Sequence, residues 1–303
     1  METSMVAAVI VLYYPDPALF DRLVTSVLGQ VETIYVIDNT PEPSATIMTL
    51  LNQFAAPIVY RPLGDNMGIA YAQNVGIREA IQGKCTHVLL LDKDSVLSTG
   101  MINLLLSAEA SLIARGNKIA AVGPVFIDEK TGKSSPASRC EALRIRRIPI
   151  DLSTSEPVET DYIIASGSLI QKSTFDAVGM MREDLFIDWV DIEWGLRAKN
   201  AVYKSYLIPT AILHHSIGDA TVKIFGKVMN VHSDIRHYYI VRNAAYLIQL
   251  KTMGWHWRML TALRLPRYVL GFSWCSQKKL KSLKLLSRAL IHGLEARTGR
   301  FEP

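Results

Sequence analysis

The stretch Thr86-His-Val-Leu-Leu-Leu-Asp-Lys-Asp94 decides the fold of this chain. Its apolar centre, from Val88 to Leu91, is typical of a short strand buried on both faces of a sheet, and two carboxylates follow it directly. In an extended backbone, residues i and i+2 point to the same side, so we expect Asp92 and Asp94 to face one point. Such a pair suits a divalent cation that also binds phosphate groups. The alternative is an ordinary acidic turn.

Apolar strands and amphipathic helices alternate around this stretch. The pattern predicts strands over 5–14, 33–38 and 57–60, and helices over 17–28, 44–54 and 68–82. This alternation predicts an α/β fold with a parallel sheet covered on both faces. In such sheets, ligands bind beyond the carboxyl ends of the strands. Tyr13, Asp38 and Asp92 each end a predicted strand, so we expect them to converge on one edge.

A loop that leads into a helix, from Asp65 to Ile77, combines glycine with small side chains. Gly68 allows the backbone to approach a neighbour closely where the helix begins. Ala70 and Ala72 keep that helix slim, which suits contact either with a ligand or with another element of the fold. The chain contains neither the G-x-G-x-x-G fingerprint nor a P-loop, which argues against the usual dinucleotide and ATP sites.

The middle of the chain, residues 128–160, is polar and interrupted by prolines. A patternless connector of this length in a compact domain often indicates a functional loop, and we interpret it as one. A strand-like segment over 162–170 follows, and Ser166, Gly167 and Ser168 interrupt it.

Two groups of ionisable side chains lie later in the chain. Residues 184–197 form a second acidic centre, in which Asp191 stands where a helix is predicted to begin. Carboxylates at a helix N-terminus also act as simple caps, and this alternative applies to Asp191 and to Glu193. His214 and His215 follow a predicted strand, and since adjacent side chains point in different directions, we expect at most one of them to serve a shared metal or diphosphate.

Composition limits the class of protein. The 303 residues are 49% hydrophobic and 20% charged, and no apolar run approaches the roughly 18–20 residues that span a bilayer. The N-terminus lacks the basic segment of a signal peptide, so we expect a cytoplasmic protein. The three cysteines show no metal-binding spacing and are expected to be reduced; they are Cys85, Cys140 and Cys275.

The charge is concentrated near the C-terminus. Residues 251–303 contain eleven Lys/Arg and two Asp/Glu, a net charge of +9, so the other residues carry 5 − 9 = −4. Aromatic side chains are interleaved with these basic ones. Such helices favour the surface of an anionic membrane, at about 1 kcal/mol for each basic residue. Nucleic acid is the alternative, which we disfavour because the chain carries no known nucleic-acid motif. We therefore expect residues 254–292 to contact the membrane.

Five motifs, taken in order, resemble those of the family 2 glycosyltransferases. They are Ala8-Val-Ile-Val-Leu-Tyr13, Val36-Ile-Asp38-Asn39, Asp65-Asn66-x-Gly68-x-Ala70-x-Ala72-x-Asn74-x-Gly76-Ile77, Asp92-Lys93-Asp94 and Asp188-Trp189-Val190-Asp191-Ile192-Glu193-Trp194. The resemblance covers roughly residues 5–245 and is greatest to bacterial rhamnosyltransferases that build O-antigen and related lipopolysaccharides. It implies a GT-A fold, a Rossmann-like domain with a mostly parallel central sheet, a nucleotide-sugar donor and inversion at the anomeric carbon.

The resemblance also implies roles for individual residues. Asp191 matches the position of the catalytic base, while Asp94 and His215 match positions that hold a divalent metal, Mg²⁺ or Mn²⁺. The implied donor-binding residues are Tyr13, Asp38, Asn66, Gly68, Asp92, Lys93, Asp94 and His215. The implied acceptor-binding residues are Ser166, Gly167, Asp188, Trp189, Glu193, Arg236 and Arg242. The chain departs from the family at Leu12 and Tyr14, where Thr and Asn are usual, and at Val190, where Glu is usual.

From this resemblance we expect transfer of L-rhamnose from dTDP-β-L-rhamnose to a lipid-diphosphate-linked saccharide at the inner face of the cell membrane. The expected domains are a GT-A domain over 1–245, with a donor half over 1–127 and an acceptor half over 128–245, and a membrane-associating helical extension over 246–303. The alternatives are another donor, such as UDP-galactofuranose or UDP-glucose, a nucleotidyltransferase, and a non-catalytic membrane-bound scaffold. The oligomeric state stays open, a homodimer included.

Overall fold

A computed structural model of the chain describes residues 4–128, 132–141, 144–215, 221–224, 227–230 and 232–302, with side chains left undescribed for 215, 221–224 and 227–230. The strands are β1 (Val6–Leu12), β2 (Thr33–Asp38), β3 (Ile58–Pro62), β4 (His87–Asp92), β5 (Ser95–Leu97), β6 (Ile119–Asp128), β7 (Ala137–Glu141), β8 (Arg144–Ile148), β9 (Val158–Thr160), β10 (Leu169–Gln171), β11 (Lys204–His215), β12 (Thr221–Ile224) and β13 (Lys227–Asn230). The helices are α1 (Pro17–Val27), α2 (Ala45–Leu51), α3 (Ile69–Gln82), α4 (Met101–Ala114), α5 (Lys172–Val178), α6 (Val190–Asn200), α7 (Asp234–Leu247), α8 (Trp255–Cys275) and α9 (Lys279–Leu294), with 3₁₀ turns η1 (Glu183–Leu185) and η2 (Lys251–Met253).

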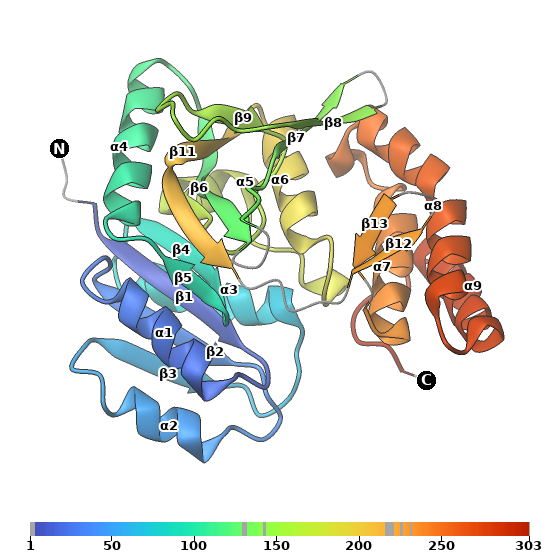
Figure 1. Ribbon diagram of the computed structural model, residues 1–303, viewed down its shortest axis with the longest axis horizontal. Coiled ribbons are helices and arrows are strands. Elements are labelled where there is room, and N and C mark those ends of the chain that lie inside the picture. Colours follow the sequence, from blue (N-terminus) through green and yellow to red (C-terminus); the bar gives the residue numbers. More distant parts are fainter. Residues whose placement is uncertain are drawn as a thin grey trace.

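A mixed, mostly parallel sheet forms the centre of the molecule (Figure 1). Its strands follow the order β3-β2-β1-β4-β10-β6-β11-β5, and β9 pairs with β11. The pairings give β1, β2, β3, β4, β6 and β11 one direction, and the remaining strands β5, β9 and β10 run the opposite way. The predicted α/β class is confirmed. The antiparallel β10 lies between β4 and β6, which brings the segment before it against the end of β4.

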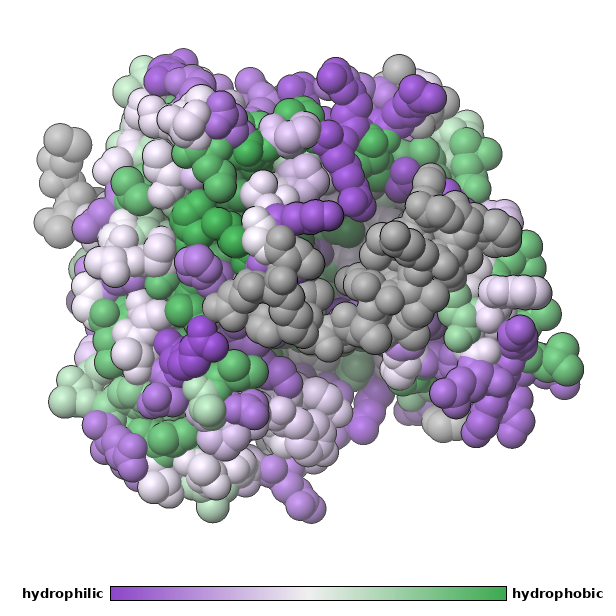
Figure 2. Space-filling view, in the orientation of Figure 1, coloured by the Kyte–Doolittle hydropathy of each residue, from purple (hydrophilic) through white to green (hydrophobic). Residues whose placement is uncertain are grey.

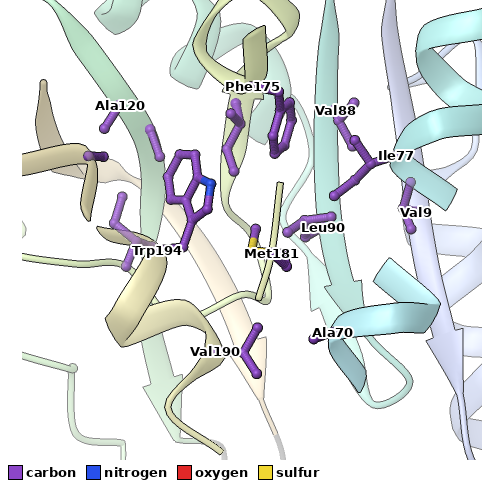
Figure 3. Packing of buried hydrophobic residues seen from close by; sticks show 14 of the residues in the cluster. Val9, Ala70, Ile77, Val88, Leu90, Ala120, Phe175, Met181, Val190 and Trp194 are labelled. Carbon is purple, nitrogen blue, oxygen red and sulfur yellow. The ribbon is translucent and has the colours of Figure 1, made fainter. Parts of the chain in front are cut away.

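Two apolar layers cover the two faces of this sheet. Along β1, alternate residues face opposite layers, so Val9 packs toward α3, α5 and α6, while Ile10 packs toward α1, α2 and α4. Figure 3 shows the first layer, in which Trp194 from α6 and Phe175 from α5 lie in one cluster with the strand residues Val88 and Leu90. Because β1 is buried on both faces, it reads as a continuous apolar run.

The helices α7, α8 and α9 gather at one end of the molecule (Figure 1). Their buried residues form a third apolar cluster, which also includes Phe186. The predicted boundary near residue 245 falls inside α7, and the proposed division into domains stays a prediction. None of the helices among the described residues is long and apolar enough to cross a membrane.

Two local predictions were wrong. The segment 128–160 is not a patternless loop, because it contains the β7–β8 hairpin and the short strand β9. Four arginines interrupt its apolar pattern, and a strand tolerates such residues on its solvent-facing side. The backbone also fails to stay extended through Asp94: β4 ends at Asp92, and Lys93 and Asp94 form a tight turn into β5. The argument from i and i+2 alternation therefore does not apply to these two carboxylates.

Candidate active site

The carboxyl ends of three parallel strands meet at one edge of the sheet. In the strand register, Asp38 at the end of β2 lies opposite Leu12 of β1. On the other side of β1, Asp92 at the end of β4 lies opposite Val11. Since neighbouring strands are about 4.8 Å apart, the backbones at Asp38 and Asp92 are separated by about 10 Å. Tyr13 follows β1 directly and is 42% exposed. The strand register thus places the ends of β1, β2 and β4 side by side, so the predicted convergence of these segments is observed.

Asp38 anchors one wall of this edge. Its side chain is fully buried; Oδ2 accepts a hydrogen bond from the Tyr60 hydroxyl at 2.7 Å, and Oδ1 accepts one from the Thr40 N–H at 3.0 Å. Burial is the largest cause that raises the pKa of the Tyr60 hydroxyl, and the Asp38 carboxylate raises it further. Tyr60 therefore stays neutral and donates its hydrogen bond to Asp38. A direct contact between Asp38 and a donor stays a prediction.

The donor loop, residues 65–68, is held by an asparagine pair. Asn39 Nδ2 donates to Asn66 Oδ1 at 3.0 Å, and Asn39 Oδ1 accepts from the Met67 N–H at 2.8 Å. Asn66 Oδ1 also accepts from the Gly68 N–H at 3.1 Å. Gly68 has a φ of 87° and a Cβ there would lie 2.7 Å from the Phe186 ring, so only glycine fits. Asn39 belongs to one of the family motifs but is not among the predicted site residues. Its position directly after Asp38 could have indicated its role.

The β4–β5 turn joins the ends of β4 and β1. Lys93 Nζ donates to the carbonyl oxygens of Tyr13 at 2.6 Å and of Tyr14 at 3.1 Å. Lys93 therefore fixes the backbone of Tyr13 and Tyr14, where the nucleoside is predicted to bind. Asp92 and Asp94 lie on either side of Lys93 and are both partly buried.

The interruption at residues 166–168 packs against the end of β4. The Gly167 N–H donates to the Leu90 carbonyl at 2.7 Å, and the Ser166 hydroxyl accepts from the Asp92 N–H at 3.2 Å and contacts Ser95 Oγ. Ser166 is 1% exposed, and Gly167 is buried against Pro124. Both residues lie beneath the surface and shape the position of Asp92, and their predicted contacts with an acceptor stay a prediction.

A strained turn leads into the helix that carries Asp191. Phe186, Asp188 and Trp189 have φ angles of 65°, 63° and 68°. Each such conformation costs on the order of 1 kcal/mol or more for a residue with a Cβ, so surrounding contacts must hold the turn. α6 begins directly after it, and Asp191 occupies its first turn.

Asp191 lies close enough to Asp92 for the two carboxylates to repel each other. Burial, as the largest cause, and the charge of Asp92 raise the pKa of Asp191 to about 6, while hydrogen bonds from backbone N–H groups, including that of Ile192 at 2.8 Å, oppose the rise. Asp191 also lines a small cavity with Ala165 and Leu90, beside the end of β4. The structure thus brings together two carboxylates that are 99 residues apart in sequence. The catalytic role of Asp191 stays a prediction.

The remaining predicted acceptor residues separate into two groups. Asp188 accepts from Arg236 Nε at 3.3 Å near the surface, and Trp189 Nε1 donates to the Ile240 carbonyl at 3.1 Å. Glu193 and Arg242 are 0% and 1% exposed: Glu193 pairs with the Arg197 guanidinium at 3.0 Å, and backbone carbonyls occupy the guanidinium of Arg242. Their predicted acceptor contacts stay a prediction. The burial of these two charged side chains could not be read from the sequence, because it depends on packing between elements.

A divalent metal fits the donor set at the β4–β5 turn. Asp92 and Asp94 are partly buried carboxylates on either side of Lys93 that could supply oxygen ligands, and metal binding there stays a prediction. This fits a cation such as Mg²⁺, which takes one or two carboxylates and completes its shell with water and substrate phosphate. His215, the other predicted ligand, ends β11, but its side chain lies outside the described residues.

Comparison with known proteins gives matches over most of the chain. Residues 8–179 match the family described as Glycosyl transferase family 2. The dTDP-rhamnosyl transferase RfbF of Shigella flexneri is 34% identical over 248 residues, which cover 81% of this chain and 80% of that protein. An uncharacterized protein of Mycobacterium tuberculosis is 28% identical over 205 residues, which cover 63% of this chain and 67% of the relative.

Solved structures share the fold at low sequence identity. GalNAc-T7, crystallised with UDP, GalNAc and Mn²⁺, superposes with a TM-score of 0.60 at 13% identity, over 90% of this chain and 57% of that one. S. aureus TarS 1–349 in complex with UDP gives a TM-score of 0.56 at 13% identity, over 96% of this chain and 82% of that one. At these identities the likeness concerns the fold alone.

Proposed function

Because this chain belongs to glycosyl transferase family 2 and is a glycosyltransferase, we propose that it transfers L-rhamnose from dTDP-β-L-rhamnose to a lipid-diphosphate-linked saccharide, with inversion at the anomeric carbon. The observation that supports it best is the position of Asp191 in the first turn of α6, beside Leu90 of β4, where the charge of Asp92 acts on it. The choice of donor rests on the 34% identity to an enzyme named as a dTDP-rhamnosyl transferase.

Asp191 acts as the general base in this proposal. Glycosyl transfer needs a group that accepts the proton of the acceptor hydroxyl as the new bond forms to the anomeric carbon. A pKa raised to about 6 makes Asp191 a stronger base than an exposed aspartate and leaves it ionised at neutral pH. General-base catalysis is most effective when the pKa lies near the working pH.

Asp92 and Asp94 face the other reactant, the nucleoside diphosphate that leaves. A divalent cation held there would neutralise the charge that develops on this leaving group. Tyr13, Asp38, Asn66 and Gly68 would form the nucleoside side of the site, and Lys93 fixes the backbone of Tyr13.

The membrane carries the acceptor in this proposal, and α8 provides an exposed apolar stripe. Its exposed residues recur at helical spacing over about 29 Å; they are Trp255, Met259, Leu263, Leu270 and Trp274. Figure 2 shows apolar and polar side chains interleaved over the end formed by α8 and α9. Exposed lysines border the stripe, among them Lys279, whose Nζ lies 4.3 Å from the Trp274 ring centroid. The hairpin β7–β8 packs beside α8 and adds exposed arginines, including Arg144 and Arg147.

This surface supports peripheral attachment to the inner face of the cell membrane, with the enzyme in the cytoplasm. The apolar stripe would insert at the headgroup level, while the basic side chains attract anionic lipid. O-antigen or a related polysaccharide is the proposed product.

The deciding experiment separates donor choice from chemistry. Purified protein is incubated with dTDP-rhamnose, UDP-galactofuranose or UDP-glucose, with Mg²⁺ or Mn²⁺ and a lipid-diphosphate-linked saccharide, and product is measured for the parent and for Asp191→Asn. We expect product with dTDP-rhamnose alone, and a loss of about 10²- to 10⁴-fold in Asp191→Asn with donor affinity largely kept. Turnover with a UDP-sugar only would replace the donor, and near-normal turnover of Asp191→Asn would remove it as the base.

A further inference from the structure

Arg242 and Asn243 are buried polar side chains in the middle of α7 that the reaction itself does not use. They are 1% and 0% exposed. Within the described part of the chain, no carboxylate lies within ion-pair distance of the Arg242 guanidinium; carbonyl oxygens and an amide occupy it instead. Burying a charged or polar side chain is costly unless its hydrogen bonds are satisfied, so the partners of these two residues matter.

Their donors converge on the strained turn that precedes α6. Asn243 Nδ2 donates to the carbonyls of Leu185 at 2.9 Å, Ile187 at 2.8 Å and Asp188 at 3.0 Å. Arg242 Nη2 donates to the same Leu185 carbonyl at 2.8 Å. The residues between these carbonyls include the left-handed Phe186 and Asp188, whose conformation needs outside support.

The two side chains also fix each other and the end of the chain. Arg242 Nε donates to Asn243 Oδ1 at 2.8 Å, which orients the Asn243 amide so that its N–H groups face the turn. Arg242 Nη1 donates to the Gly299 carbonyl at 2.6 Å, and the Gly299 N–H donates to the Asp184 carbonyl at 2.7 Å. The turn is therefore held between α7 and residues 299–301.

The opposite side of the turn contacts the donor loop. The Phe186 carbonyl accepts from the Ile69 N–H at 2.7 Å, and the Phe186 ring stacks on Tyr239 at 5.1 Å between centroids. Arg242 and Asn243 thus bind one side of the turn. Phe186 on its other side packs against Gly68, and α6 with Asp191 follows directly after it.

We propose that Arg242 and Asn243 are positioning residues for glycosyl transfer: they hold the Leu185–Trp189 turn in the left-handed conformation that sets Asp191 against Asp92. The inference rests on the proposed function through the role of Asp191. Neither residue touches substrate. They act by keeping the turn closed, so that Asp191 stays partly buried and correctly placed for the acceptor hydroxyl.

Two conservative substitutions test this. Asn243→Asp keeps the shape but replaces the amide donor with an oxygen that repels three carbonyls. Arg242→Lys keeps the charge, but one ammonium group cannot reach Leu185, Gly299 and Asn243 together. The matched control is Gln249→Ala in the turn that follows α7, where Nε2 donates to the Gly293 carbonyl and so contacts α9 instead of the Leu185–Trp189 turn.

Three readouts are compared: kcat, the acidic limb of its pH profile, and hydrogen exchange of peptides covering residues 184–190. In both variants we expect kcat to fall about tenfold or more, the acidic limb to move roughly half a pH unit or more lower as water reaches Asp191, and exchange over 184–190 to quicken. The control should match the parent in all three. A general loss of stability would lower the melting temperature without moving the acidic limb.

Parent-like kcat, pH profile and exchange in both variants would overturn the proposal. Should Asn243→Asp not fold, Arg242→Lys carries the same test, because it preserves charge and most of the volume. Hydrogen exchange does not depend on the chemistry, so it separates this proposal from the proposed role of Asp191. If exchange over 184–190 quickens in the two variants while Asp191→Asn keeps its turnover, Arg242 and Asn243 still hold the turn, but Asp191 is not the base.

Discussion

Replacing Asp191 with Asn should make the protein more stable at alkaline pH while it abolishes turnover. Burial and the nearby Asp92 raise the pKa of Asp191 from 3.8 to about 6. A carboxyl whose folded-state pKa is raised contributes stability below its unfolded pKa, and loses it as the pH rises through the folded value. At about 1.4 kcal/mol for each pKa unit, the ionised carboxylate costs about 3 kcal/mol of unfolding free energy at pH 8 and about half of that at pH 5.

Asn cannot ionise, so Asp191→Asn should gain about 3 kcal/mol over the parent at pH 8 and about half as much at pH 5. Urea unfolding of both proteins at the two pH values, with a chelator and no donor, measures the difference. Comparing the two pH values cancels any pH-independent effect of the amide on its N–H partners. Asp176→Asn serves as the control, because Asp176 is 62% exposed and should show no such dependence. An equal gain at both pH values would refute the reasoning about burial and Asp92.

Four further outcomes are expected. Asp94→Ala should lose the metal-dependent part of donor affinity, which calorimetry measures with Mg²⁺ and with a chelator. The same gain in affinity from Mg²⁺ in parent and variant would contradict this. Asn39→Ala removes two hydrogen bonds from the donor loop and should weaken donor binding about thirtyfold at about 1 kcal/mol per bond, as measured by the same titration. The parent kcat should rise through pH 6 as the base ionises, and a flat profile from pH 5 to pH 8 would exclude this. Leu263→Glu combined with Leu270→Glu should release the protein from anionic vesicles in a flotation assay, whereas Leu104→Glu on α4, also exposed, should leave binding unchanged.

The acidic edge of the sheet could be predicted because it depends on local pattern. Apolar runs ending in Tyr13, Asp38 and Asp92 indicate strands buried on both faces, and parallel strands place their carboxyl ends together. β2 was predicted with its observed bounds, and β1, α1 and α3 to within two residues at each end. The turn at Lys93 escaped prediction, because two polar residues after a strand fit extension and reversal equally well.

The hairpin β7–β8 shows where pattern fails. Its strands carry arginines on exposed positions and bury only a few apolar side chains against α8, so they lack the alternation that identifies a half-buried strand. The buried Glu193 and Arg242 show a related failure. Charged residues are usually exposed, and only the contacts of the folded chain reveal which of them are enclosed and satisfied.

The sequence by itself determined the α/β alternation, the family resemblance, and the carboxylates that end the strands, because a residue's neighbours along the chain dictate periodicity and strand direction. Only the tertiary structure decided that the charge of Asp92 acts on Asp191, that Ser166 is buried beneath Asp92, and that Arg242 and Asn243 donate hydrogen bonds to a turn of positive φ. These relations join segments far apart in sequence, and they exist only once the sheet, its covering helices and α7 pack together and set burial and distance.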